Sequence, residues 1–489
     1  MDPIDDVLGW HRLDRRMLLV HPVREVVRFL PVLIGLLLFN RGTEGGYWGL
    51  IGVAIPVGLG LLRYVTTSYR LTSGRVEVRS GLLNKRVVST PLDRVRTVDL
   101  TASPIHRALG LVTVRVGTGQ SSEKGDGRLV LDGLSVAAAA QLRSRLLRVS
   151  AAPDDGTDDG IERATHRRIV LTLDLSWVRF APLTSAGVVI AGAALGLVAQ
   201  AFRTVEWAPT IDEHELQRLG VTVLVLGGLA TVVVVLCVLA VVGYLVTNFG
   251  FVLSQTADDG SWHLRRGLFT TRETSLDDAR VSGVSIGEPL SLRLAGGARL
   301  SAIVTGLGKK QQGSSVLVPP APRREVDRVA AEVLRGGGPI TVALVPHGSR
   351  AVRRRWTRSL VPAAAVAVAA ALAAYYLSAW FVVVALVALG AGVVLAIDRA
   401  RGLGHALVDG HLVARSGSLT RRREALATGS VIGWNLRSTW FQRRAGLADL
   451  VATTAGGRQH VRVLDLPEDD AVALAHAAHG GLLEPFLVL

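Results

Sequence analysis

The stretch RSGLLNKR, residues Arg79 to Arg86, carries the pattern Arg-x-Gly-x-(apolar)-x-x-Arg that decides how this 489-residue chain is organised. Two later stretches have the same pattern, RRGLFTTR at Arg265 to Arg272 and RSGSLTRR at Arg415 to Arg422. None of the three resembles a catalytic site. Their repetition therefore has to be explained by the organisation of the chain.

The match extends well beyond the quoted stretches when they are aligned on their central glycines. Positions of the same type recur at identical offsets from these glycines, namely −2, +2, +5, +14, +17, +26 and +29. The aligned sets, glycines first, are Gly81, Gly267 and Gly417; Arg79, Arg265 and Arg415; Leu83, Phe269 and Leu419; Arg86, Arg272 and Arg422; Val95, Val281 and Val431; Val98, Val284 and Trp434; Arg107, Arg293 and Arg443; and Gly110, Gly296 and Gly446. Such a pattern indicates three internal repeats.

Each repeat has the pattern of a small antiparallel sheet. Residues Arg75 to Arg79 alternate polar and apolar between two Ser-Gly pairs, which is typical of a strand between turns. Gly81 is expected to shape the turn and Leu83 to face the core. Further short strands are predicted over Lys85–Thr90, Val95–Leu100, Leu111–Val116 and Arg128–Leu131. Each repeat then ends in a helical stretch, predicted over Ser135–Val149, Arg323–Arg335 and Pro467–His479.

Long apolar runs separate the repeats, and 49% of all residues are hydrophobic. Phe180–Phe202 and Leu219–Val246 contain no charged residue, and Leu360–Ile397 is long enough for two spans joined at the aromatic run YYLSAW. Phe29–Asn40 and Gly45–Leu62 predict a further pair. A buried core helix would explain one short run but not runs of this length. The sequence therefore predicts six transmembrane helices in three hairpins.

The distribution of basic residues predicts the orientation of these spans. The three short hairpin loops hold only Arg41, Arg203 and Arg218 of the 55 Lys and Arg, whereas basic residues gather between the hairpins. By the positive-inside rule, both termini and all repeats are cytoplasmic in a multi-pass protein of the cell membrane. No cleavable signal peptide is expected, because the first residues are polar and acidic. The net charge of +15 favours contact with anionic headgroups over nucleic-acid binding, because the basic residues flank the spans.

These observations divide the chain into nine segments. We predict an N-terminal segment with the first hairpin (1–66), a module (67–149), an acidic linker (150–166), the second hairpin (167–247), a second module (248–335), a linker with a basic juxtamembrane segment (336–357), the third hairpin (358–398), a third module (399–480) and a tail (481–489).

This organisation resembles that of the bacterial pleckstrin-homology membrane proteins of the YdbS/YdbT type. The resemblance rests on YRLTSGRVEVRSGLLNKR, on Ser103–Gly119 (SPIHRALGLVTVRVGTG) and on its counterpart Thr439–Gly456 (TWFQRRAGLADLVATTAG). The three-module layout is that of the larger YdbT-like members. The second copy departs most, with an extra residue between Pro289 and Arg293. The resemblance implies an α+β membrane protein whose hairpins each precede a PH-like antiparallel β-module, a sandwich or partly open barrel with a C-terminal helix. It also implies a smaller single-module homologous partner, but no activity.

The sequence favours no enzymatic site. GLGKKQQGSS (306–315) lacks the first glycine and the Ser or Thr of a phosphate-binding loop. His476 and His479 fit exposed helix positions better than metal ligands, and the single cysteine, Cys237, lies in a predicted span. We therefore expect no enzyme, no metal and no cofactor. A coupled transporter is disfavoured because the long uncharged runs contain no ionisable residue.

The repeated arginines have two interpretations. Arg86, Arg272 and Arg422 could contact lipid headgroup phosphates from a turn near the membrane, or pair within the module. Positions Arg107, Arg293 and Arg443, like Gly81, Gly267, Gly417, Gly110, Gly296 and Gly446, are interpreted as structural. Sheet edges could bind proteins instead. The sequence thus predicts a non-enzymatic membrane scaffold whose modules associate with each other or with a homologous partner. A lipid-binding or lipid-transport role is the alternative. Membrane lipids are expected partners and nucleic acid is not.

Overall fold

The computed structural model describes most of the three repeats and one complete apolar hairpin. The described residues are 10–12, 14–18, 20, 58, 66–72, 75–80, 86–91, 97–117, 129–148, 167–184, 213–257, 260–305 and 315–479. Several predictions lie outside them. These are the two apolar runs of the first hairpin, of which only Gly58 is described, the first turn with Gly81 and Leu83, the acidic linker and the C-terminal tail.

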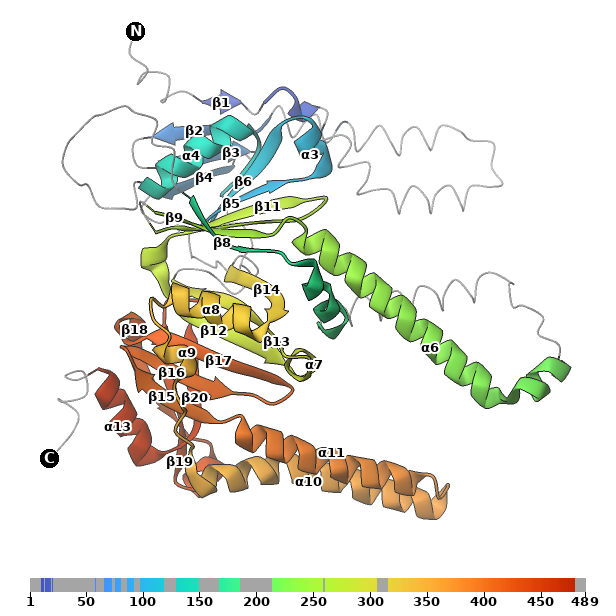
Figure 1. Cartoon of the computed structure of the whole chain (residues 1–489). Helices are drawn as coiled ribbons and strands as arrows, with labels where there is room; N and C mark the ends of the chain where they lie inside the picture. Colours follow the sequence, from blue (N-terminus) through green and yellow to red (C-terminus); the bar gives the residue numbers. More distant parts are fainter. Residues whose placement is uncertain are drawn as a thin grey trace, which may run out of the picture. The chain divides into compact units, whose positions relative to one another are not determined.

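Each repeat contains six strands and a closing helix in the same order, with a short helix after the fourth strand (Figure 1). Repeat 1 comprises β2 (Ser68–Thr72), β3 (Arg75–Ser80), β4 (Arg86–Pro91), β5 (Thr97–Ala102), α3 (Pro104–Ala108), β6 (Leu111–Gly117), β7 (Leu129–Ser135) and α4 (Val136–Arg148). Repeat 2 comprises β9 (Val252–Thr256), β10 (Trp262–Arg266), β11 (Thr271–Leu276), β12 (Val281–Pro289), α7 (Leu290–Leu294), β13 (Gly297–Val304), β14 (Val316–Pro322) and α8 (Arg323–Val333). Repeat 3 comprises β15 (Gly404–Val408), β16 (His411–Ser416), β17 (Thr420–Ala427), β18 (Val431–Arg437), α12 (Trp440–Arg443), β19 (Leu447–Thr454), β20 (His460–Pro467) and α13 (Glu468–Ala478).

The remaining elements lie before or between the repeats. They are β1 (His11–Arg12), β8 (Arg167–Thr172), the 3-10 helix η3 (Leu175–Leu183), α6 (Glu213–Asn248), the 3-10 turn η4 (Asp278–Arg280), α9 (Gly338–Thr341), α10 (Gly348–Tyr376), α11 (Phe381–Arg401) and the 3-10 turn η6 (Thr428–Ser430).

The strands of the described part form four antiparallel sheets, and two of these join strands from neighbouring repeats. Their orders are β1-β2-β3-β4, β7-β6-β5-β11-β10-β9-β8, β14-β13-β12-β17-β16-β15 and β18-β19-β20. The chain divides into two compact units, and the division falls inside repeat 2 between Arg280 and Val281. The first unit joins repeat 1 to the first sheet of repeat 2, and the second joins the rest of repeat 2 to repeat 3. Compact units and sequence repeats therefore do not coincide.

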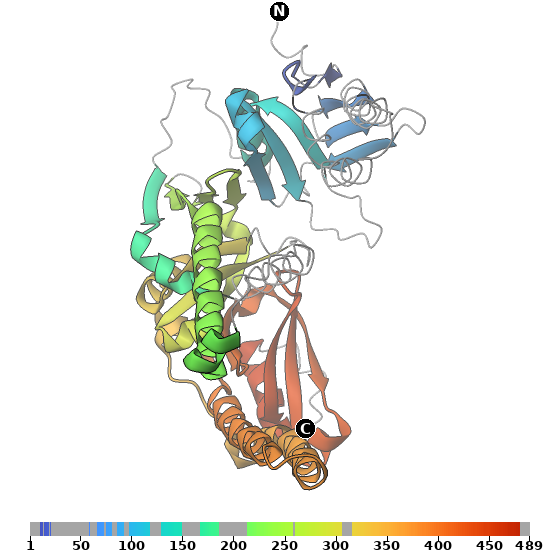
Figure 2. The ribbon, with the colours of Figure 1, turned by 90° about the vertical axis from the view of Figure 1, so that its right-hand side faces the viewer.

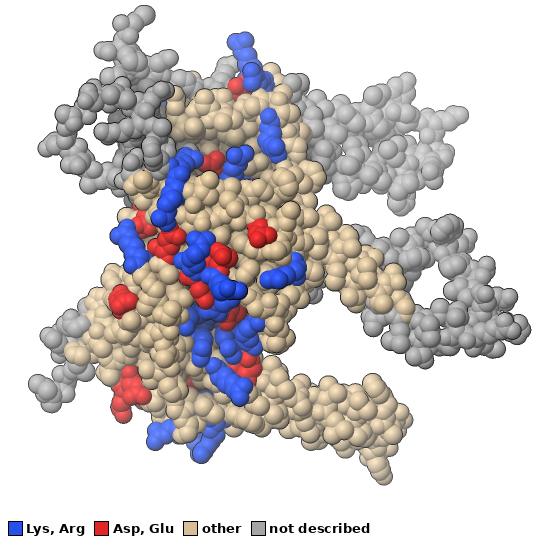
Figure 3. Space-filling model, in the orientation of Figure 1, with Lys and Arg blue, Asp and Glu red and all other residues tan. Residues whose placement is uncertain are grey.

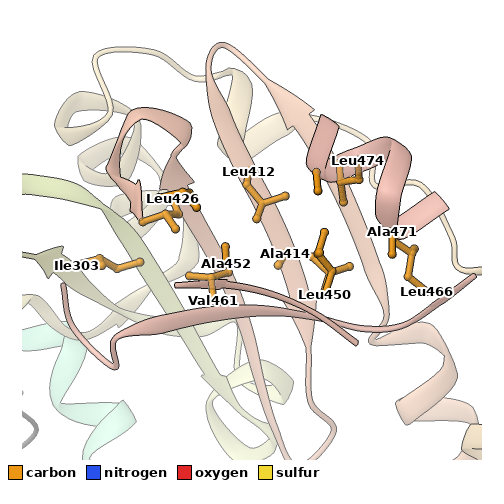
Figure 4. Close-up of a cluster of buried hydrophobic side chains, with 13 residues drawn as sticks. Ile303, Leu412, Ala414, Leu426, Leu450, Ala452, Val461, Leu466, Ala471 and Leu474 are labelled. Atoms are coloured by element: carbon orange, nitrogen blue, oxygen red, sulfur yellow. The ribbon is translucent and has the colours of Figure 1, made fainter. Parts of the chain in front are cut away.

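Each unit contains an apolar core between its sheets. In repeat 1, Val76 on β3 packs with Val98, Val114 and Leu131 of the facing sheet, and Leu142 of α4 closes the end. In repeat 3 the corresponding core lies between β16–β17 and β19–β20 (Figure 4). Helix α13 covers this core with the residues that its 3.6-residue period places on one face, Ala471, Leu474 and Ala475. Repeats 1 and 3 are thus small sandwiches closed by a C-terminal helix.

The third predicted hairpin is present as two antiparallel helices, α10 and α11, joined at Leu377–Trp380 (Figures 1 and 2). Both are long and apolar enough to span a membrane. Only 11% of the most apolar window of α11 is buried, so it differs from the core helix of a soluble domain. The two helices approach closely at Gly392, where a Cβ would overlap that of Ala363. Small residues at such crossings are typical of membrane helix pairs.

The second predicted hairpin is described only in part. Helix α6 contains the predicted span Leu219–Val246 and is anchored to repeat 2, since the Tyr244 hydroxyl donates to the carbonyl oxygen of Pro320 at 2.9 Å. The preceding predicted span differs from expectation at its beginning. Phe180 lies in η3 and is completely buried beside Gly297. The apolar character of Phe180 therefore reflects packing on repeat 2, and residues 185–202 lie outside the described part.

Candidate interaction surfaces

The central glycines of repeats 2 and 3 form tight turns between paired strands. Gly267 and Gly417 have φ values of +114° and +102°, a region that side chains rarely adopt. A Cβ at Gly417 would overlap the carbonyl oxygen of Thr420. The apolar residues two positions later, Phe269 and Leu419, are 59% and 58% exposed. Leu83 is predicted to face the core, but its counterparts Phe269 and Leu419 do not, because their side chains lie at the tip of the turn.

The second set of repeated glycines follows the short helices. Gly110, Gly296 and Gly446 have φ between +61° and +72°, and each N–H donates to the carbonyl oxygen three residues earlier, at 3.1–3.2 Å. Those carbonyls belong to Arg107, Arg293 and Arg443. A glycine in the left-handed region is a common helix ending because it adopts this conformation without strain.

The side chains of Arg107 and Arg293 reach toward the next repeat. Arg107 Nη1 donates to the carbonyl oxygen of Leu268 at 2.7 Å. Arg293 Nη1 lies 3.5 Å from the carbonyl oxygen of Ser418, and its Nη2 donates to Asp398 at 2.6 Å. Both repeat-to-repeat contacts therefore end on the residue that follows a turn glycine.

The arginines predicted to contact lipid lie on strands that follow the turn. Arg86 begins β4, and its side chain is outside the described part. Arg272 on β11 pairs with Arg266 on one side and Thr101 on the other. Arg422 on β17 pairs with Ser416 and with Gly287. Neither Arg272 nor Arg422 projects from a free turn, and their contact with lipid stays a prediction.

Arg422 lines a pocket of about 320 Å³ that also contains Arg299, Glu424, Arg458 and His460. Burial raises the pKa of the Glu424 carboxyl, against the influence of Arg458 and Arg422. Burial also lowers the pKa of the Arg422 guanidinium, and the nearby Arg458 acts in the same direction. The environment of Arg422 is thus a half-buried cluster of mixed charge.

A second pocket, of about 400 Å³ and open to solvent, lies where the α10–α11 hairpin meets repeat 3. It is lined by Arg355 and Arg358 of α10, by Arg399 of α11, and by the turn around Gly417. In Figure 3 Lys and Arg gather at this base of the hairpin, whereas the hairpin beyond it carries no charge. The sequence predicted that these basic residues flank a span. It did not predict their contact with a turn of repeat 3, because that contact depends on tertiary packing.

Asp465 holds the base of α10 against repeat 3. Its carboxylate is 1% exposed and forms ion pairs with Arg354 at 2.6 Å and Arg355 at 2.5 Å. Gln442 Nε2 also donates to it at 2.8 Å. Asp398 on α11 makes a similar bridge by accepting from both Arg293 and Arg421. Charged groups at both helix ends thus fix the hairpin to the sheets.

His347 is buried at the same junction and is neutral at physiological pH. Its Nδ1 donates to the carbonyl oxygen of Leu464 at 2.7 Å, and its ring lies 5.1 Å from that of His405. Burial lowers the pKa of His347 to about 4 and also lowers the pKa of His405. Protonation of either ring would place a charge inside the junction, where burial disfavours it.

Comparison with known proteins identifies the family. The bacterial PH domain matches residues 26–150 and 360–479, half of the chain, and these matches include repeats 1 and 3. No curated protein and no solved structure matches the chain. The matched ranges also include the first and third predicted hairpins in whole or in large part, so the sequence resemblance noted above is confirmed for two of the three copies. The chain therefore belongs to the bacterial PH domain family and carries two copies of that domain.

Proposed function

We propose that this protein is a non-enzymatic membrane scaffold whose three PH-like repeats bind proteins at the cytoplasmic surface of the cell membrane. The pairing of β12 with β17 carries the proposal, because it joins two repeats through their sheet edges over seven residue pairs. A sheet edge of this kind that is left unpaired can add a strand from another protein. Repeat 2 counts as the third PH-like copy because its elements follow the same order as those of repeats 1 and 3.

The membrane part of the proposal extends what α10 and α11 support. These helices, together with α6 and the apolar runs outside the described residues, favour six spans in three hairpins. The basic residues at the base of the α10–α11 hairpin favour a cytoplasmic position for repeat 3. A smaller homologous membrane protein or a second copy is the expected partner, and neither nucleic acid nor a cofactor has a part in the proposed role.

Purification from native membranes in mild detergent tests the scaffold role. The full-length chain is expected to elute as a stable complex with a second protein or with itself. A chain that elutes alone, at the size of a single protein in its micelle, would contradict the proposal. The isolation must start from native membranes because detergent extraction after overexpression would leave the partner substoichiometric.

Lipid binding is the second candidate function, and the pocket at the hairpin base favours it. Three guanidinium groups of that pocket, those of Arg355, Arg358 and Arg399, lie beside an apolar helix pair, where a lipid phosphate would be. The exposed Arg358 is the best single test. Arg358→Gln is expected to lower the amount of anionic lipid that co-purifies, whereas unchanged lipid in the Arg358→Gln and Arg399→Gln variants would exclude this pocket. In the same assay, variants of Arg86, Arg272 and Arg422 test whether the arginines that the sequence predicts to contact lipid do so.

A further inference from the structure

The two junctions between repeats have the same strand register. In the first, Thr97 pairs with Leu276, and in the second Gly283 pairs with Leu426. Counted from the turn glycines, each pair joins position +16 of one repeat (97 − 81, 283 − 267) to position +9 of the next (276 − 267, 426 − 417). The arginine at +26 reaches the carbonyl at +1 of the next repeat in both cases. Each repeat thus offers its fourth strand to the third strand of its successor.

Repeat 3 carries the same fourth strand, β18, and no further repeat pairs with it among the described residues. Among the described residues β18 pairs only with β19. Leu436 on β18 is 42% exposed, whereas Ile286 at the matching position of β12 is fully buried. Ile432 is 67% exposed, whereas its counterpart Ser282 is buried. We call the free side of β18, together with the exposed Phe441 and Arg443 of α12, the β18 edge.

A glycine on β18 points to a strand as the missing neighbour. At Gly283 of β12, a Cβ would overlap the carbonyl oxygen of Ala425 on the paired strand. Gly433 is the matching residue of β18, and nothing lies within 4 Å of its Cβ position. Glycine weakens a strand unless another backbone approaches closely. The close approach that explains Gly283 is therefore unfilled at Gly433.

The register also tells which strand fits. At position +20, Thr101 and Gly287 face Arg272 and Arg422 at position +5 of the following repeat. The residue of β18 at +20 is Arg437, which is exposed. In a second copy of this chain, position +5 of the first repeat is residue 86, also an arginine. Like charges directly opposite each other destabilise a strand pair, so this edge disfavours the chain's own β4.

We propose that the β18 edge binds the first sheet of a bacterial PH domain on a different polypeptide, one with a carboxylate at the position opposite Arg437. This inference rests on the proposed scaffold function and adds the surface and the register. The partner's third strand continues the sheet beside β18, its acidic side chain pairs with Arg437, and Arg443 donates to the carbonyl after its turn glycine. Arg437 also disfavours a head-to-tail chain of copies formed through this edge.

Charge reversal tests the edge without knowledge of the partner. In Arg437→Glu, residue 86 of a second copy becomes an attractive neighbour, and the association constant is expected to rise about tenfold. Purified full-length Arg437→Glu should form assemblies that wild type does not form. The double variant Arg437→Glu with Arg86→Glu should lose them. Arg437→Glu with the oligomeric state of wild type would overturn the proposal, and unchanged unfolding temperatures verify that each variant is folded.

Cysteine pairs test the register in the same assemblies, in a Cys237→Ala background. The register places Leu436 (+19) opposite Val87 (+6), so Leu436→Cys with Val87→Cys should form an intermolecular disulfide. Leu436→Cys with Ser89→Cys, two residues out of register, is the matched control and should not. Equal yields from the two pairs would contradict the register. A 436–87 disulfide formed without Arg437→Glu would mean that a second copy is the natural occupant and would also overturn the proposal.

Purification from native membranes separates failure of this inference from failure of the scaffold function. Leu436→Lys is expected to lose a partner that wild type retains, and a photo-crosslinking residue at position 436 should label the third strand of the partner's PH domain. Retention of the partner by Leu436→Lys would leave the scaffold function intact and refute the β18 edge. Labelling of residues 480–489 of the same chain would refute it as well. Absence of any partner from wild type would refute the scaffold function itself.

Discussion

Replacement of Asp465 by asparagine should destabilise the attachment of the membrane hairpin to repeat 3. Asp465 has a φ of +55°, a conformation that Asn tolerates, so the substitution preserves shape and backbone and removes only the charge. It leaves the guanidinium groups of Arg354 and Arg355, 11% and 12% exposed, without their carboxylate. Removing one partner of a buried ion pair typically costs about 3–5 kcal/mol. Since the Asn amide oxygen can still accept one hydrogen bond, we expect about 3 kcal/mol.

Unfolding of the purified protein in detergent, followed by tryptophan fluorescence, measures this loss. A cost of about 3 kcal/mol corresponds to a decrease in the midpoint of about 6–12 °C for a cooperative unit of 150–250 residues. Hydrogen exchange should show the increased opening in β19, β20 and the first turns of α10. Asp409→Asn is the matched control, because Asp409 also has a positive φ, of +48°, but is exposed. Its effect should stay within about 0.5 kcal/mol.

The reasoning fails if Asp465→Asn unfolds within about 0.5 kcal/mol of wild type, or if Asp409→Asn is equally destabilising. A double variant locates the cause. Adding Arg354→Met to Asp465→Asn removes one of the two stranded cations and should restore part of the loss, since an uncompensated buried charge costs more than the missing pair itself. If the two substitutions were simply additive, the cost would come from packing and not from charge.

Three further properties follow from the geometry. Gly417→Ala should cost about 1–3 kcal/mol in the same unfolding assay because φ is +102° and a Cβ meets the Thr420 carbonyl, whereas Gly429→Ala, in open space, should be nearly neutral. Because the pKa of His347 is lowered in the folded protein, the unfolded chain binds more protons between pH 6.5 and pH 4. The free energy of unfolding of wild type should therefore decrease by about 2 kcal/mol between pH 7 and pH 5, and that of His347→Gln should lack this decrease. Identical pH profiles of the two proteins would exclude His347 as the cause. His405, Asp465 and Arg355 act on the same ring and are unchanged in that comparison. A reporter active only in the periplasm should be silent when fused after Val149, and activity there would reverse the predicted orientation.

The sequence predicted those elements whose signals are local. The strand over Arg75–Arg79 and the helix over Pro467–His479 are present as β3 and α13 within one residue at each end. Alternation, turn glycines and an acidic first turn act over a few residues and can be read directly. The hairpin at Leu360–Ile397 could be predicted for the same reason, because its length and its central aromatic run are properties of one segment.

The surfaces could not be predicted to the same extent, because they depend on contacts between distant segments. Alternation shows which face of a strand is buried but not which strand lies beside it, so the pairing of β12 with β17 left no sequence signal beyond Gly283. Arg293 was interpreted as structural for its spacing to a glycine, yet its salt bridge to Asp398 joins residues 105 positions apart. Arg399 lines a pocket because α11 packs antiparallel to α10, which brings its guanidinium within hydrogen-bond distance of Ser359. The sequence alone does not show this contact.

The pairing of sheet edges also distinguishes repeat 2 from repeats 1 and 3. Repeat 2 has both of its sheets extended by a strand of another repeat, β11 by β5 and β12 by β17, whereas repeats 1 and 3 each have one sheet that no other repeat extends among the described residues. A doubly paired repeat must satisfy a neighbour on each side, and on β12 this is seen at Gly283, where an added side chain would overlap the carbonyl oxygen of Ala425 on β17. The end repeats are free of one such constraint. At position +20, repeats 1 and 2 have the small residues Thr101 and Gly287, whereas repeat 3 has the exposed Arg437. We infer that this arginine selects the strand that can pair with the open edge.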